Sequence, residues 1–149
     1  MKKVILIGFV IMLFAVSGLV FLKTQVYTTF EHYEPTISLN EVTGLSNTEI
    51  VEKLFIRYLE HYKDKPLFDD QRIKEYKFVG SSEKFAAEEG TAFFLTYSFK
   101  QHFWNDSPGV AGQRTSDGML TTSRYVSLIK EKDQFKLKIM GLEPPKKKK

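Results

Sequence analysis

The chain has 149 residues and a formal net charge of +4 at pH 7, with 42% hydrophobic and 27% charged residues. This balance is typical of one globular domain and argues against wholesale disorder. The sequence has no cysteine, which excludes disulfides, zinc–cysteine sites, thiol catalysis and cysteine-linked lipid anchors. Lys2, Lys3 and Lys146 to Lys149 supply six positive charges, so the stretch between them sums to −2. We therefore expect no nucleic-acid partner.

The first element expected is an apolar helix, within a signal anchor at residues 1–23. Val4 to Leu22 contains no charged residue, and its 19 residues would form about 28 Å of helix, close to the roughly 30 Å core of a bilayer. We interpret it as one transmembrane helix. Ala15-Val16-Ser17 has the shape of a signal-peptide cleavage site, so a secreted protein is an alternative. A buried core helix is disfavoured, because the run is apolar on every side.

The flanking charges predict the orientation of this anchor. Lys2 and Lys3 precede the apolar run, whereas Lys23 alone follows it closely. Positive charge stays on the cytoplasmic side, so the N-terminus should be cytoplasmic and the domain extracytoplasmic.

Residues 24–45 show no clean periodicity and are interpreted as a membrane-proximal stalk, with a short strand near residues 37–42. Ser46 and Glu49 then have the spacing of a capping box, which marks the start of a helix. The apolar residues after the cap follow the helical period and end before Pro66. They are Ile50, Val51, Leu54, Phe55, Tyr58, Leu59 and Tyr62. The sequence predicts a helix over residues 47–63.

The period changes to two from Ile73 onward, which indicates strands. We expect strands at 73–80, 84–87, 91–103, 120–130 and 135–139, with a turn at 88–90. In the strand at 91–103, alternate apolar residues should face the core, beginning with Phe93, Leu95 and Tyr97. Residues 105–118 are predicted to form a 14-residue loop, and the sequence ends in a basic tail at 144–149.

A helix followed by antiparallel strands indicates an α+β domain over residues 46–143, with one long helix on a curved sheet of four to five strands. The order resembles the nuclear-transport-factor-like and ketosteroid-isomerase-like superfamily, whose domains form a cystatin-like cone. The resemblance is carried by the helix stripe, by Ala92 to Tyr97, and by a closing hairpin that joins Tyr125 to Ile129 with Phe135 to Ile139. It implies a small membrane-anchored, exported bacterial protein. This architecture serves enzymes, binding modules and assembly domains alike.

The chemical motifs of an enzyme are missing from the sequence. The histidines at 32, 61 and 102 have no metal-ligand spacing, and there is no phosphate-binding glycine loop or nucleophile elbow. We expect no metal, no cofactor and no catalytic residue. Asp69-Asp70 and Glu88-Glu89 are interpreted as solvated turns, and Tyr58 and Tyr97 as core residues.

The loop after the best strand supplies the candidate binding residues, which are Trp104, Asn105, Asp106 and Arg114. A large rigid aromatic beside a long loop suits a binding anchor, although Trp104 could instead cap the open end of the sheet. Lys146 to Lys149 are expected to be a solvated tail, with contact to anionic lipid or wall polymer as the alternative.

These observations together favour a membrane-anchored extracytoplasmic domain that binds a protein or a cell-envelope component without catalysis. One alternative is a cone-fold enzyme or carrier acting on a small apolar molecule, which would need a cavity with an acid or histidine inside. The other is a protein secreted after signal cleavage.

Overall fold

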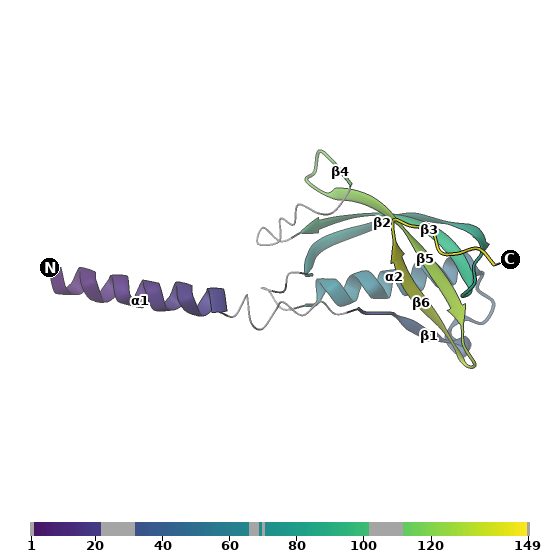
Figure 1. The fold of residues 1–149 in the computed structure, drawn as a ribbon, viewed down its shortest axis with the longest axis horizontal. Coiled ribbons are helices and arrows are strands. Elements are labelled where there is room, and N and C mark those ends of the chain that lie inside the picture. The colour runs from purple at the N-terminus through teal and green to yellow at the C-terminus, as the bar shows by residue number, and fades with distance from the viewer. Residues whose placement is uncertain (1, 22–31, 66–68, 70, 102–111, 149) are drawn as a thin grey trace.

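The computed structural model describes residues 2–21, 32–65, 69, 71–101 and 112–148, and the side chains of 2–6 and 21 are not among the described groups. The domain is α+β, as predicted. Its described strands form one antiparallel sheet with the order β1-β6-β5-β3-β2, and β4 pairs with β5. The sheet curls, and helix α2 lies against its concave side, where it contacts both β2 and β6 (Figure 1).

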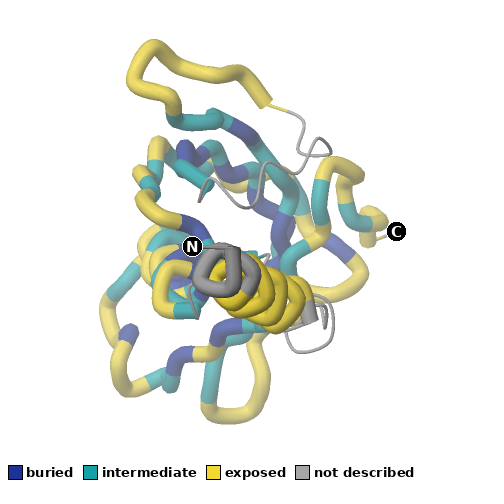
Figure 2. Tube along the Cα trace, turned by 90° about the vertical axis from the view of Figure 1, so that its left-hand side faces the viewer, coloured by how far each residue is buried: buried dark blue, intermediate teal, exposed yellow. Residues whose placement is uncertain are grey.

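Helix α1, Lys2–Phe21, occupies the segment predicted as an anchor. Its described side chains, at residues 7–20, are all exposed (Figure 2). Within the part of the chain that the structure describes, no helix combines the length and the apolar character needed to cross a membrane. The predicted span is therefore confirmed as a helix only.

Helix α2, Asn47–Lys63, has the predicted bounds. The Ser46 hydroxyl accepts a hydrogen bond from the Glu49 amide at 3.3 Å, and the Ser46 amide donates to the Glu49 carboxylate at 2.8 Å. These contacts form the capping box and lower the pKa of Glu49 below its usual range. The residues of the predicted stripe are buried or half-buried, so this stripe is the face that packs on the sheet.

The strands carry the other half of the core. In β3, Thr91–Gln101, the predicted inward residues Phe93, Leu95 and Tyr97 are buried. Strands β5, Leu120–Lys130, and β6, Gln134–Gly141, form the closing hairpin beside β3. The predicted core set of Phe55, Leu59, Phe93, Leu95, Tyr97 and Leu137 is buried as one cluster, with Ile139 partly buried against it.

Strand β2, Ile73–Ala86, is one continuous strand, so the prediction of two strands separated after Gly80 is wrong. Its pairing with β3 shifts register at three places, between residues 73 and 75, 78 and 80, and 83 and 85. Each bulge adds a residue and bends the strand, which lets it follow the curl of the sheet. The same bulges break the period-two pattern, which is why the sequence indicated an interruption.

Much of the predicted stalk belongs to the domain. Strand β1, Thr36–Ser38, pairs with β6, and the 3-10 helix η2, Leu39–Val42, follows it directly. Ile37 and Val42 are buried in the core. The interpretation of residues 24–45 as a stalk is therefore wrong for residues 33–45, because apolar side chains there complete the core from the sheet edge.

Part of the predicted 105–118 loop forms strand β4, Gln113–Arg114, which pairs with β5 through a short hairpin. The turn of this hairpin is closed by the Thr115 amide, which donates to the carbonyl of Met119 at 2.8 Å. The prediction of an unstructured loop is thus wrong at its C-terminal end, and residues 105–111 lie outside the described residues.

The basic tail also belongs to the fold. Residues 142–148, which we call the C-terminal strap, return to the turn between β2 and β3, where Lys147 bridges to Ala87. The Glu88 amide donates to the carbonyl of Lys146 at 2.9 Å, and the Lys148 amide donates to the carbonyl of Ala86 at 3.1 Å. A freely solvated tail is therefore wrong for Lys146 to Lys148, because their backbone extends the sheet edge.

Deleting residues 144–149 should lower the free energy of unfolding by about 1–3 kcal/mol, since each of the two lost backbone hydrogen bonds contributes roughly 0.5–1.5 kcal/mol. Urea denaturation of the detergent-solubilised full chain, followed by circular dichroism, measures this loss. Replacing Lys146 and Lys148 by serine keeps both backbone bonds and is expected to cost less than about 0.5 kcal/mol. Equal losses in the two variants would contradict a structural role for the strap.

Candidate functional site

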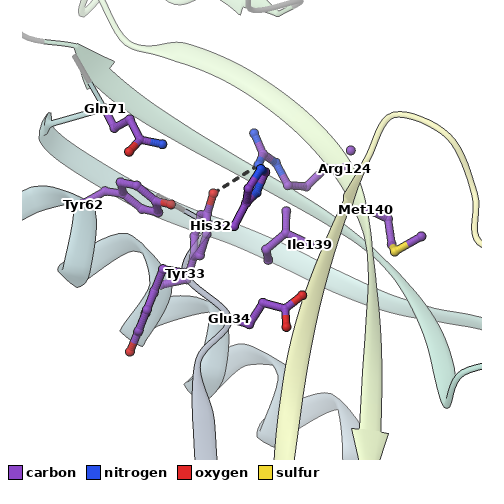
Figure 3. A pocket seen from close by; sticks show the side chains of 10 residues that line it. His32, Tyr33, Glu34, Tyr62, Gln71, Arg124, Ile139 and Met140 are labelled. Atoms are coloured by element: carbon purple, nitrogen blue, oxygen red, sulfur yellow. Dashed lines mark hydrogen bonds between the residues drawn. The ribbon is translucent and has the colours of Figure 1, made fainter. Parts of the chain in front are cut away.

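One end of α2 borders a cleft of about 330 Å³ between the helix, the segment before β1 and the strands β5 and β6 (Figure 3). Its volume is at the small end of the range for small-molecule sites. The lining residues are His32, Tyr33, Glu34, Tyr58, Tyr62, Gln71, Arg124, Ile139, Met140 and Gly141. The cleft therefore combines aromatic walls with a small number of polar and charged groups.

Arg124 is the cation of this cleft. It lies in β5 directly opposite Leu95 of β3, and paired residues in neighbouring strands share a face, so its side chain enters the concave, apolar side. Arg124 Nη1 donates a hydrogen bond to Tyr58 Oη at 3.4 Å. The Arg124 Cζ atom lies 5.2 Å from the centroid of the Tyr97 ring, within the range of a cation–π contact. β5 thus places a positively charged side chain beside the hydrophobic core.

The guanidinium of Arg124 has unused hydrogen-bonding capacity. Its Nε atom is buried and has no hydrogen-bond partner. A buried donor left in this state costs about 1–3 kcal/mol, and more when it belongs to a charged group. Because Nε is buried, an anion in the cleft would contact the Nη groups of the same guanidinium.

Glu34 is the acid that lines the cleft, and it is engaged elsewhere. Its carboxylate lies 2.5 Å from Lys136 Nζ, and this hydrogen bond raises the pKa of Lys136 above its usual range. Among the described residues, Arg124 forms no ion pair with a carboxylate. The cleft therefore holds a positive charge that the acid beside it does not neutralise.

Aromatic rings hold the floor of the cleft in place. The ring of Phe55 stacks on Tyr58 with centroids 5.5 Å apart and meets Tyr97 edge-on at 4.9 Å. Tyr58 in turn meets Tyr62 edge-on at 4.7 Å. Contacts of this kind fix ring orientation, so the hydroxyl groups near Arg124 sit on a rigid frame.

Burial raises the pKa of Tyr97 to about 12, and the nearby Arg124 partly opposes this effect. The phenol of Tyr97 is consequently neutral throughout the physiological pH range. Tyr97 lies in the core behind the cleft, where its ring faces Arg124 and adds no negative charge that would cancel the guanidinium.

The sequence missed this site. Arg124 was detectable, since it is a charged residue on the inward side of β5, where the next two inward residues are the buried Val126 and Leu128. A charged residue on a buried face is informative, because burying an unpaired charge is costly. His32 and Glu34 had no such mark in the sequence, because the segment before β1 joins the cleft only through tertiary pairing.

The structure separates the residues that the sequence singled out. Trp104, Asn105, Asp106 and His102 lie outside the described residues. Arg114 lies exposed in β4 and does not line the cleft.

The remaining predicted features have mixed outcomes. Tyr58 packs against the core, as predicted, and also lines the cleft. Asp69 is buried, accepts a hydrogen bond from the Gln71 amide at 2.8 Å and lies 3.6 Å from Lys65 Nζ, so a solvated turn is wrong there. Glu88 and Glu89 lie in an exposed turn, as predicted. In the described residues, no three His, Asp or Glu side chains gather as a metal site.

No protein-family model matches the chain, and neither a curated protein nor a solved structure is significantly similar to it.

Proposed function

We propose that this chain is a membrane-anchored extracytoplasmic protein whose cleft binds an anionic component of the cell envelope without catalysis. The observation that carries the proposal is the uncompensated guanidinium of Arg124 in an aromatic-walled cleft. Arginine suits this role because its planar fork of donors matches the oxygens of a carboxylate or phosphate. A helix packed in a curled sheet is also what the cone-shaped superfamily resemblance leads us to expect.

The anchor is supported by the sequence and by the exposure of α1. The uncharged run in the sequence extends from Val4 to Leu22. The structure describes the side chains of α1 only at residues 7–20, so the run is longer than the described part. Phe14 is 76% exposed and Ile11 is 64% exposed. Exposing a helix that is apolar on all sides to water is unfavourable, and insertion into a bilayer would bury this apolar surface.

A binding role is favoured over catalysis by the state of the groups in the cleft. A general base needs a titratable group within reach of the substrate and free to accept a proton. Glu34 is held by Lys136, which leaves His32 as the other acid or imidazole among the lining residues. The guanidinium of Arg124 offers only hydrogen-bond donors, which suits an anchor for an anion.

The small molecules that accompany the purified protein test this function. The full chain, extracted from bacterial membranes in polymer nanodiscs, should carry an acidic compound that organic extraction releases and mass spectrometry detects. Arg124→Gln should reduce its amount at least tenfold, because the charge-assisted hydrogen bonds are lost. Lys77→Gln, which removes one charge from an exposed position of β2, is the control and should leave the amount unchanged. Equal amounts in all three proteins would contradict the proposed site.

A reporter that fluoresces only in the cytoplasm, fused after Lys149, should stay dark in cells. The reason is that Lys2 and Lys3 hold the N-terminus inside, which places the domain on the other side of the membrane. Imaging together with membrane fractionation measures the outcome. A bright, membrane-bound fusion would overturn the orientation, and a mature N-terminus near Gly18 would show that the protein is secreted instead.

A further inference from the structure

The position of the cleft along the chain relates it to the membrane. His32, Tyr33 and Glu34 line the cleft, and ten residues separate them from Phe21 at the end of α1. Even a fully extended segment of that length spans at most about 40 Å between Phe21 and His32. If α1 lies in the bilayer, this wall of the cleft cannot move farther than that from the end of the anchor.

Two exposed apolar side chains lie beside the cleft, at the end of β6 and just after it. Met140 lines the cleft at the end of β6 and is 37% exposed, and Leu142, two residues later, is 64% exposed. Within the described part of the domain, the other exposed large hydrophobic side chains are Ile56 and Val79, which do not line the cleft. Met140 follows Ile139 in the strand and therefore points to the other side of the sheet, away from Arg124 (Figure 3). Exposed apolar side chains beside a site are typical of contact with a membrane.

The interior of the cleft offers two kinds of surface side by side. The guanidinium of Arg124 donates a hydrogen bond to the hydroxyl of Tyr58. Figure 3 shows the aliphatic side chain of Ile139 close to Arg124. A free inorganic anion would use the guanidinium and leave the apolar wall without a partner. An uncharged hydrocarbon would leave the guanidinium without an anion. A molecule with both parts satisfies both surfaces.

We propose that the cleft takes a single-chain anionic amphiphile from the bilayer, with its carboxylate or phosphate head on Arg124 and the start of its chain along Ile139. This inference rests on the proposed function and names the ligand class of the same site. A single chain is specified because a cleft of about 330 Å³ is at the lower limit for small-molecule sites. The source is the membrane, because the proposed anchor would keep the cleft close to it and Met140 and Leu142 lie exposed beside the cleft.

Photolabelling of the full chain in nanodiscs of zwitterionic phosphatidylcholine tests the inference. The probe is myristate carrying a diazirine group, and mass spectrometry locates the label after irradiation. We expect label on peptides that contain residues 32–34, 124 or 139–142. Arg124→Gln should reduce the labelling at least tenfold, while Lys77→Gln should leave it unchanged. Arg124→Lys keeps the charge without the planar fork and should give an intermediate value, and circular dichroism verifies that each variant is folded.

Competition identifies the part of the ligand that matters. Unlabelled myristate and dodecyl phosphate should suppress the labelling, whereas methyl myristate, acetate and inorganic phosphate should need at least tenfold higher concentrations. If acetate or inorganic phosphate competes as well as myristate, the ligand is a soluble anion, which overturns this inference and leaves the proposed function standing. If methyl myristate competes equally, or if labelling does not depend on Arg124, both the amphiphile and the anion site are wrong.

Discussion

Replacing Leu95 by alanine should lower the free energy of unfolding by about 2–5 kcal/mol, the range for large-to-small changes in a closed core. Leu95 lies in the central part of β3 and is fully buried, in the cluster that joins the sheet to α2. Truncation leaves a cavity between two rigid layers that cannot collapse around it. Leu59→Ala, on the helix side of the same cluster, should give a loss of similar size. Urea denaturation followed by circular dichroism measures both.

Two matched variants separate burial from side-chain size. Val79→Ala changes a β2 residue that is 57% exposed, and Ile56→Ala changes the outer side of α2. Each should cost less than about 1 kcal/mol, since little apolar surface returns to water. If Leu95→Ala and Leu59→Ala also cost less than about 0.5 kcal/mol, the two layers do not meet through the faces described above.

The helix and the main strands could be predicted because their information is local. The capping box at Ser46 and the apolar stripe after it decide the start and the buried face of α2 within one short segment. The alternation in β3 likewise assigns Phe93 and Leu95 to the core without reference to any other strand. Such patterns predict an element from its own residues, without knowledge of what it packs against.

The elements that escaped prediction depend on partners far away in the chain. Strand β1 is three residues long and exists as a strand because Thr36 pairs with Lys136. The strap is extended because Lys147 meets Ala87. Neither segment is long enough to show a periodic hydrophobic pattern, so its composition alone suggested a stalk or a free tail.

The cleft could not be predicted for the same reason. Its walls come from the segment before β1, from α2, and from strands β5 and β6, and only the curl of the sheet brings these together. Arg124 was the one local mark, as a charged residue at an inward strand position. Its meaning depends on Tyr58 and Tyr97, which lie in different elements.

Replacing Gly90 by alanine should destabilise the domain by about 2–5 kcal/mol, combining backbone strain with overpacking. Gly90 ends the turn between β2 and β3 with a φ of +83°, a conformation that costs other residues roughly 1–2 kcal/mol. A Cβ atom there would lie 2.1 Å from the carbonyl oxygen of Leu128 and 3.1 Å from the Cα of Ile129. Both atoms belong to the backbone of β5, so relief requires the strand or the turn to move.

Gly44→Ala separates the two contributions. Gly44 has the same φ of +83°, and a Cβ atom added there meets nothing within 4 Å. This variant should therefore show the backbone strain alone, about 1–2 kcal/mol, when both proteins are compared by urea denaturation. The excess loss at Gly90 measures how closely the β2–β3 turn is pressed onto β5. Equal losses at the two positions would mean that the turn yields freely, and that the contact between Gly90 and Leu128 does not hold the hairpin in its place on the sheet.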